Sequence, residues 1–134
     1  EITTRLVGSE MCIRDRIEAV WEEKLDTLDI KWSDKSCACV VMASGGYPEK
    51  YETGKVISGL DENGQCEGAF VYHAGTKLED GKFLTAGGRV LGITAYGDTL
   101  KEALDTAYKA VDTISFEKAH YRHDIGKKAL SALK

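Results

Sequence analysis

The chain has 134 residues, of which 43% are hydrophobic, and this is enough for one globular domain with a hydrophobic core. Its formal net charge of -4 argues against general binding to nucleic acids or anionic membranes, because both usually require clustered Lys and Arg. The apolar runs at 37–43 and 90–96 are far shorter than the ~20 residues of a membrane-spanning helix. No secretory signal pattern opens the chain, so we expect a cytoplasmic protein with reduced thiols.

The first sixteen residues have no clean apolar period. They include the string LVGSEMCIRDR, which resembles a translated sequencing-adaptor artefact. We therefore expect a non-native or poorly ordered leader at 1–16, of which residues 1–12 contribute little to the core, and one domain at 17–134. Apolar residues at helical spacing predict a helix over about 13–26; they are Ile17, Val20, Trp21, Leu25 and Leu28.

Strands and glycine turns are expected beyond the first helix. The predicted strands are 37–43, 56–60, 67–75 and 89–96, with an ordered loop at 44–54 and a hairpin at 76–86 that turns at Asp80-Gly81. Thr99 and Glu102 form a T-x-x-E capping box that begins a helix over about 99–114, and a short terminal helix can follow. The order of these elements predicts an α+β fold with a small, mainly antiparallel sheet or partial barrel and two to three packed helices.

Cys37 and Cys39 stand one residue apart, a spacing that is unusual for zinc or dithiol sites. Cys12 and Cys66 provide no second pair at a matching distance. We therefore predict no metal site and interpret 37–43 as a buried strand in which cysteine serves as a small hydrophobe.

The segment GGRVLGITAY begins with Gly87 and Gly88, followed by Arg89. Glycines let backbone N–H groups come close to a ligand, and an arginine adds a planar, charged fork that suits phosphate or carboxylate. The residues thus indicate an anion-binding corner. A tight bend whose arginine pairs with a surface carboxylate fits the same triplet, which is a weak motif by itself.

Three blocks at 40–60, 71–104 and 107–130 together carry the patterns G-Y-P-x-x-Y, H-A-G-T and G-G-R-V-L-G. Over roughly 17–131 the chain resembles the C-terminal domain of the phosphoribosylamine-glycine ligases, ATP-grasp enzymes of purine biosynthesis. This resemblance implies a single-hybrid-motif-like domain of an enzyme that joins glycine to 5-phosphoribosylamine. It implies ATP and Mg (or Mn) as cofactors of the parent enzyme, bound mainly by ATP-grasp and N-terminal domains outside this segment, so the chain alone is expected to be inactive.

The same resemblance implies a substrate-binding role for one set of residues and no catalytic or metal-binding residue in the chain. Arg89 would meet the substrate phosphate, Lys77 would be a second phosphate contact, and the others would face the same cleft: His73, Gly75, Thr76, Gly87 and Gly88. A structural histidine is the alternative for His73. Tyr47 and Pro48 are expected to shape the 44–54 loop, and Arg122, His123 and Asp124 to form structural pairs.

Two other functions stay open on the sequence. One is a non-catalytic binding module or a carrier of the biotinyl or lipoyl type, although no lysine stands at a hairpin tip as in such carriers. The other is an interaction domain without chemistry. An intact-mass measurement for covalent biotin or lipoate would separate the carrier from the ligase domain.

Overall fold

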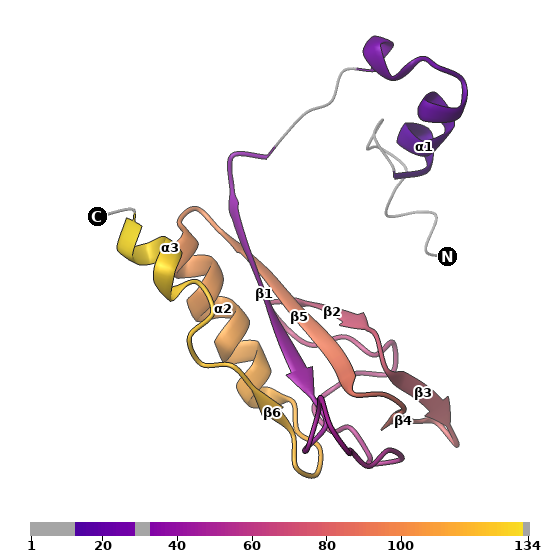
Figure 1. Cartoon of the computed structure of the whole chain (residues 1–134), viewed down its shortest axis with the longest axis vertical. Helices are drawn as coiled ribbons and strands as arrows, with labels where there is room; N and C mark the ends of the chain where they lie inside the picture. The colour runs from indigo at the N-terminus through magenta and orange to yellow at the C-terminus, as the bar shows by residue number, and fades with distance from the viewer. Residues whose placement is uncertain (1–12, 29–32, 133–134) are drawn as a thin grey trace. The chain divides into compact units, whose positions relative to one another are not determined.

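The computed structural model describes residues 13–28 and 33–132 (Figure 1). The chain divides into two compact units at Asp34 and Lys35, and each unit is described here by itself. The predicted leader lies mostly outside the described residues, so the expectation for residues 1–12 stays a prediction.

The first unit contains a helix and a short turn. Helix α1 spans Ile13–Trp21, and the 3-10 turn η2 spans Leu25–Thr27. The prediction of one helix over 13–26 is therefore wrong at its C-terminal end. Glu23 adopts a φ of 57°, a left-handed conformation that an α-helix cannot continue through.

The second unit is built on a four-stranded sheet in the order β2-β5-β1-β6, in which every pairing is antiparallel. Its strands are β1 (Ser36–Ala43), β2 (Phe70–His73), β5 (Arg89–Gly97) and the short β6 (His120–Tyr121). Figure 1 shows β1 and β5 side by side along most of their length. The α+β fold with an antiparallel sheet is thus confirmed, and only β6 was not predicted.

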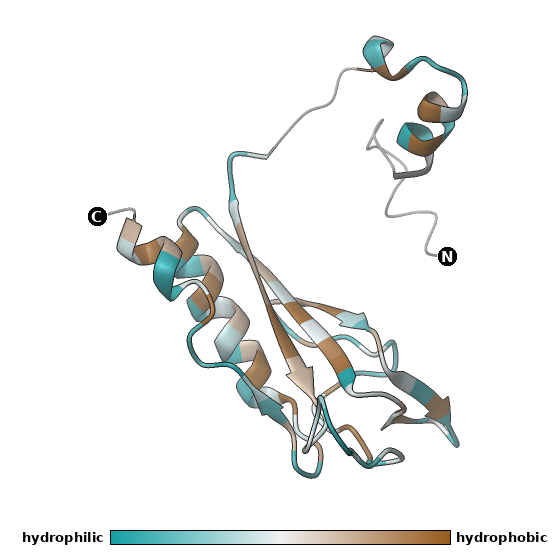
Figure 2. Ribbon diagram, in the orientation of Figure 1, coloured by the Kyte–Doolittle hydropathy of each residue, from teal (hydrophilic) through white to brown (hydrophobic). Residues whose placement is uncertain are grey.

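One face of this sheet is covered by helix α2 (Leu100–Thr113). Its N-terminus has the predicted capping box: Thr99 Oγ1 accepts from the Glu102 N–H at 3.2 Å, and Glu102 Oε2 accepts from the Thr99 N–H at 3.3 Å. The core between helix and sheet consists of fully buried aliphatic side chains, among them Val40, Met42, Val90, Leu91, Ile93 and Val111. Hydrophobic residues along β1 and β5 can be followed in Figure 2. The terminal helix α3 (Lys127–Ala132) brings Leu130 against a second buried cluster, which contains Leu104 of α2.

A separate two-stranded sheet is formed by β3 (Thr76–Glu79) and β4 (Lys82–Thr85). Asp80 and Gly81 connect the strands with φ angles of 50° and 71°, so the predicted hairpin and its turn are confirmed. The predicted strand at 56–60 is wrong. That segment makes only isolated bridges, from Val56 to Leu84 and from Ser58 to Ser115, because it crosses between two elements and bends at Gly59, where φ is 89°.

Cysteines occupy the uncovered face of β1. Ala38, Val40 and Met42 are buried beneath α2, whereas Cys37 and Cys39 are exposed. The expectation that both cysteines are buried is therefore wrong, although the strand itself is confirmed. The reason is the two-residue period of a strand: a helix on one face of the sheet buries alternate residues only.

Candidate functional site

The first residues of β5 and the loops beside it line an open pocket of about 580 Å³. It is lined by Val41, Tyr47, Tyr72, Ala74, Gly75, Ala86, Gly87, Gly88, Arg89, Leu91 and Gly92. Four of the seven predicted substrate-binding residues are thus brought together, namely Arg89 and three glycines. Arg89 is the only charged residue of this lining.

The glycines at this corner are required by close approaches within the protein. A Cβ on Gly88 would overlap Tyr47 Cδ2 and would lie 2.7 Å from Tyr47 Cε2. A Cβ on Gly75 would lie 2.5 Å from the carbonyl oxygen of Arg89 and 2.8 Å from the Cα of Gly87. Real Cβ atoms do not come this close to backbone or ring atoms. The absence of side chains therefore lets a tyrosine ring and two backbone segments form the pocket wall.

Hydrogen bonds fix the backbone of the two adjacent glycines. The hydroxyl of Ser44 donates to the Gly87 carbonyl at 2.9 Å, and the Ser44 N–H donates to the Gly88 carbonyl at 2.8 Å. Both contacts use carbonyl oxygens. Within the described part of the chain, the N–H groups of Gly87 and Gly88 have no hydrogen-bond acceptor. Two backbone donors of pocket-lining residues are thus without a partner among the described residues.

The guanidinium of Arg89 makes no ion pair or hydrogen bond with any residue in 13–28 or 33–132. The alternative prediction, a bend closed by an arginine–carboxylate pair, is therefore not what these residues form. Arg122 provides the contrast, because both oxygens of Asp124 accept from it at 2.9 Å and 2.8 Å. This pair raises the pKa of Arg122 and lowers that of Asp124, chiefly through the hydrogen bonds. Among the described residues the guanidinium of Arg89 has no partner, whereas Nε and Nη2 of Arg122 both donate to Asp124.

The remaining three predicted residues do not line the pocket. His73 Nε2 lies 2.8 Å from the carbonyl oxygen of Gly64, so this nitrogen must carry the proton and donate. Its Nδ1 lies 2.8 Å from Thr76 Oγ1, and its ring lies 5.0 Å from that of Phe83. Lys77 forms an ion pair with Glu79 on the same strand, β3. His73 and Thr76 thus connect the turn at 61–65 to the hairpin.

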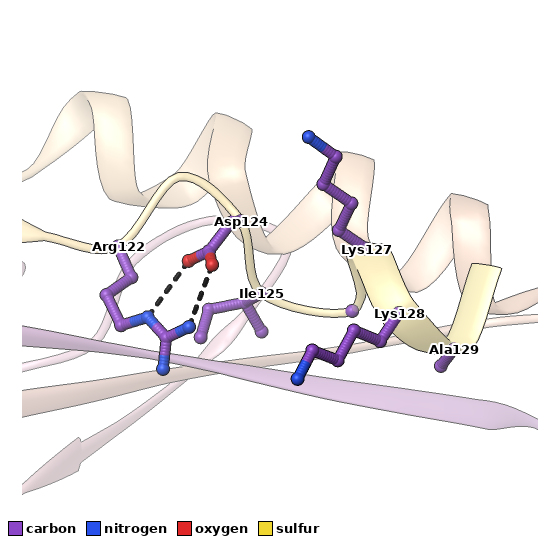
Figure 3. A pocket seen from close by; sticks show the side chains of 7 residues that line it. Arg122, Asp124, Ile125, Lys127, Lys128 and Ala129 are labelled. Carbon is purple, nitrogen blue, oxygen red and sulfur yellow. Dashed lines mark hydrogen bonds and ion pairs between the residues drawn. The ribbon is translucent and has the colours of Figure 1, made fainter. Parts of the chain in front are cut away.

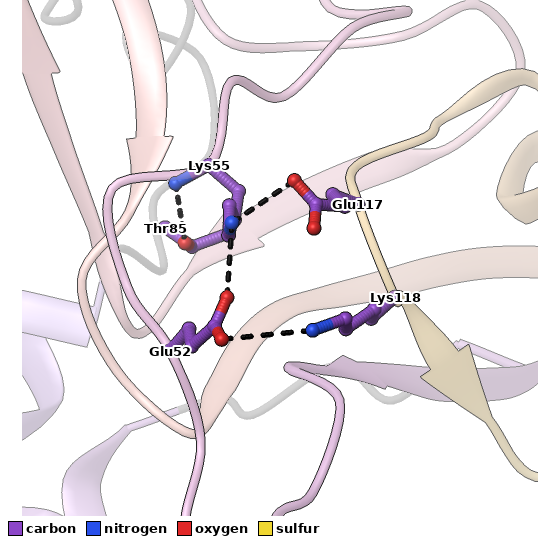
Figure 4. A network of polar contacts seen from close by, with 5 residues as sticks. All are labelled: Glu52, Lys55, Thr85, Glu117 and Lys118. Atoms are coloured by element: carbon purple, nitrogen blue, oxygen red, sulfur yellow. Dashed lines mark hydrogen bonds and ion pairs between the residues drawn. The ribbon is translucent and has the colours of Figure 1, made fainter.

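Tyr47 reaches the pocket from a loop that several contacts hold in place. Figure 4 shows that the Lys55 ammonium lies between two carboxylates, 3.0 Å from Glu52 and 2.9 Å from Glu117. Glu52 also pairs with Lys118 at 3.6 Å, and the Lys55 N–H donates to Thr85 Oγ1 at 3.0 Å. The hydrogen bond from Lys55 lowers the pKa of Glu52, and the one to Glu117 raises the pKa of Lys55.

Sequence reasoning assigned Tyr47 to the loop only, and it missed Val41 and Tyr72 as pocket residues. The G-Y-P-x-x-Y pattern singled out Tyr47, but only as a residue of its loop. No motif singled out Val41 or Tyr72. They reach the pocket only because β1 and β2 flank β5.

A second hollow lies where the chain enters α3 (Figure 3). Lys127 and Lys128 lie at its border, and the Arg122–Asp124 pair spans its other side. It contains none of the predicted substrate-binding residues. In the described residues, no three His, Cys, Asp or Glu side chains gather as metal ligands. No helix in 13–28 or 33–132 is long and apolar enough to cross a membrane.

Comparison with known proteins places these features in a family. The family model described as "Phosphoribosylglycinamide synthetase, C domain" matches residues 37–128. A phosphoribosylamine--glycine ligase of Caldanaerobacter subterraneus subsp. tengcongensis is 52% identical over 109 residues, which are 81% of this chain and 25% of that protein. The "Bifunctional purine biosynthetic protein purD" of Dictyostelium discoideum is 45% identical over 113 residues, which are 84% of this chain and 14% of that protein.

The fold agrees with this result. A crystal structure of a phosphoribosylamine--glycine ligase from Thermotoga maritima matches 66% of this chain and 21% of its own, with a TM-score of 0.59 and 39% identity. The chain spans about a quarter of the length of the bacterial relative from Caldanaerobacter. On these matches, the chain belongs to the phosphoribosylglycinamide synthetase C-domain family.

Proposed function

We propose that this chain is the C-terminal, substrate-side part of a phosphoribosylamine-glycine ligase, an enzyme that joins glycine to 5-phosphoribosylamine with hydrolysis of ATP in purine biosynthesis. The names of the relatives and the matched family model support this assignment. The main observation is the guanidinium of Arg89, which has no partner in 13–28 or 33–132 and lies at a pocket walled by Gly75, Gly87 and Gly88.

The pocket is suited to hold the phosphate of 5-phosphoribosylamine. A guanidinium can donate two parallel hydrogen bonds to phosphate oxygens, and the N–H groups of Gly87 and Gly88 add neutral donors nearby. The role of these residues is to bind and orient. A phosphate fixed at Arg89 would hold the ribose so that the amine at the other end of the substrate meets the activated carboxylate of glycine elsewhere in the enzyme.

ATP and Mg (or Mn) belong to the parent enzyme in this proposal. The described residues bring together no set of three His, Cys, Asp or Glu side chains that could hold a metal ion. The chain covers a quarter of a relative's length, which leaves room for N-terminal and ATP-grasp domains as partners. The cytoplasm is the expected location of the whole enzyme.

A carrier function has less support. Asp80 and Gly81 occupy the turn of the β3–β4 hairpin, and biotinyl and lipoyl carriers would place their modified lysine at such a tip. An unmodified intact mass after expression with biotin and lipoate would agree with the ligase proposal. A mass increase that maps to this hairpin would contradict it.

The deciding experiment is the substitution Arg89→Lys in a full-length ligase that carries this segment as its C-terminal part. Lysine keeps the charge but cannot form the two-pronged contact, and a hydrogen bond to a charged group contributes about 1.5–3 kcal/mol. We expect the apparent affinity for 5-phosphoribosylamine to fall roughly 10- to 100-fold. Affinities for ATP and glycine should stay within about twofold, because neither would touch Arg89.

Steady-state kinetics with each substrate varied in turn measure this effect, on a variant with an unchanged thermal midpoint. The matched control is Arg122→Lys, because Arg122 is already paired with Asp124 and lies outside the pocket. An equal loss for all three substrates, or the same loss in the control, would count against a phosphate contact at Arg89.

A further inference from the structure

Ser44 is a buried polar residue that contacts the glycine pair beside Arg89 from outside the pocket. It directly follows β1 and is only 3% exposed. Its hydroxyl donates to the Gly87 carbonyl at 2.9 Å, and its N–H donates to the Gly88 carbonyl at 2.8 Å. Ser44 is not among the residues that line the pocket. Any role of this residue in ligand binding must therefore act through the glycines.

The hydrogen bond from the hydroxyl sets the orientation of one peptide group. The Gly87–Gly88 peptide bond is trans, because the one cis bond of the described residues joins Tyr47 and Pro48. In a trans peptide the C=O and the following N–H point in opposite directions. Since the Gly87 carbonyl points to Ser44, the Gly88 N–H points away from it. Ser44 thus fixes the direction of a pocket donor that has no acceptor in the described part of the chain.

Side chains cannot fix this peptide group. Glycine has no Cβ, so a peptide between two glycines can take several orientations at little cost. Space is also short at both positions, because a Cβ on Gly87 would lie 3.1 Å from the Gly75 Cα and one on Gly88 would overlap Tyr47. The orientation must therefore be set by hydrogen bonds from elsewhere. Within the described residues, Ser44 is the donor to both glycine carbonyls.

Loss of the hydroxyl would change what the pocket offers to an anion. The Gly87 carbonyl would lose its partner among the described residues and could turn toward the open pocket, where water can satisfy it. Such a turn would place a carbonyl oxygen where the Gly88 N–H had been, and this oxygen would repel a phosphate oxygen that an N–H would bind. The bond from the Ser44 N–H to the Gly88 carbonyl does not use the side chain, so the change would stay local.

We propose that Ser44 is a positioning residue for the phosphate of the substrate: its hydroxyl holds the Gly87 carbonyl, so that the Gly88 N–H meets a phosphate oxygen beside Arg89. This inference rests on the proposed function. The ligand chemistry is that of a phosphate monoester, for which an arginine supplies charge and a backbone N–H supplies a neutral donor. Ser44 itself touches no substrate atom in this proposal.

Kinetics of a full-length ligase that carries this segment as its C-terminal part test the role. Ser44→Ala should raise the KM for 5-phosphoribosylamine about 3- to 10-fold, the fold-change that corresponds to one hydrogen bond. The kcat and the KM values for ATP and glycine should stay within about twofold, because neither of these substrates would contact the Gly87–Gly88 peptide. Ser44→Thr keeps a hydroxyl and should keep the KM within about twofold of the unsubstituted enzyme.

The matched control is Thr99→Ala at the start of α2. Like Ser44→Ala, it removes a hydroxyl that is hydrogen-bonded to a backbone group, but outside the pocket. Both variants should lower the thermal midpoint of the 134-residue chain, Ser44→Ala by roughly 4–12 °C, and only Ser44→Ala should change the KM for 5-phosphoribosylamine. If Ser44→Ala does not fold, Ser44→Cys replaces it, because a thiol fills the space of the hydroxyl but donates only weakly.

A second measurement needs no active ligase. The amide signal of Gly88 in the 134-residue chain is followed by NMR during titration with inorganic phosphate at constant pH and ionic strength. We expect this signal to shift in the unsubstituted chain and in Ser44→Thr, and the response to be at least about threefold weaker in Ser44→Ala. The amide of Gly81, in the hairpin turn outside the pocket lining, reports general salt effects and should not respond.

The outcomes separate this inference from the proposed function. A selective loss with Arg89→Lys but none with Ser44→Ala would overturn the positioning role and leave the function intact. The reverse would support the positioning role and count against the contact at Arg89. The same rise in KM with Thr99→Ala would overturn the positioning role.

A ligase without activity would count against the function, and the NMR titration then decides on Ser44. A Gly88 response that depends on the hydroxyl would support the positioning role. A response that is absent, or unchanged in Ser44→Ala, would overturn it.

Discussion

Replacing Gly88 by alanine tests why two glycines precede Arg89. The new methyl group would overlap Tyr47 Cδ2, and it would lie 2.7 Å from Tyr47 Cε2 and 3.1 Å from Tyr51 Cε1. Gly88 does not have a positive φ, so alanine meets no backbone strain there. The whole cost therefore comes from the tyrosine rings, chiefly that of Tyr47.

The size of the effect follows from this geometry. Forcing an extra methyl group into a packed region usually costs about 1–3 kcal/mol. For a domain of this length, that corresponds to a lower thermal midpoint by roughly 4–12 °C. In a Tyr47→Ala background the main obstacle is gone, and only the contact with the Tyr51 ring stays tight. There Gly88→Ala should cost less than about 1 kcal/mol.

The assay is a double-mutant cycle, with unfolding of the 134-residue chain by heat or denaturant as readout. Gly92→Ala, in the strand that follows Gly88, is the control, because its Cβ would lie 3.3 Å from Cys39 Sγ and at least 3.8 Å from other atoms. It should leave stability unchanged or raise it by up to about 1 kcal/mol. If Gly88→Ala costs the same with and without Tyr47, the close ring contact is not the reason for the glycine.

Three further results are expected. Thr99→Ala should lower the free energy of unfolding by about 1 kcal/mol in denaturant titrations, because it removes the capping box of α2, and full stability would contradict this. The Glu52–Lys55–Glu117 network should stabilise the fold between about pH 5 and 10. Because the pKa of Glu52 is lowered, its contribution to stability is lost only as the pH falls below 4.5; because the pKa of Lys55 is raised, its contribution is lost only as the pH rises above 10.5. A thermal midpoint that falls between pH 8 and 6 in the unsubstituted chain but not in the Glu52→Gln variant would refute this. The 134-residue chain should show no glycine-dependent ATP hydrolysis, and turnover in a coupled ADP assay would overturn the domain assignment.

Local rules explain which elements were predictable. The hairpin at Asp80-Gly81 and the capping box at Thr99 depend on residues within a few positions of each other, so the sequence displays them directly. The segment 56–60 has the composition of a strand but finds two different partners, Leu84 and Ser115. Which partner a segment meets is decided by the tertiary fold, and no local pattern contains that information.

The same distinction holds for the pocket. Arg89 and its glycines could be found in advance because they are consecutive. His73 and Lys77 were grouped with them through the family resemblance of their segment, yet their side chains have other partners, Gly64 and Glu79. Val41 and Tyr72 join the pocket through strand order alone. Spacing predicts a consecutive motif well and a composite wall poorly.

The charge of the pocket lining is smaller than the charge of its proposed ligand. A phosphate monoester carries about -1.5 to -2 charges at neutral pH, and Arg89 supplies a single positive charge. No other charged residue lines the pocket, and Lys77 is already paired with Glu79. Backbone N–H groups can offset part of the remaining charge but do not neutralise it. If phosphate binds here, we expect a further cation to come from outside this lining, and a basic side chain from another part of the parent enzyme placed beside Arg89 would supply it.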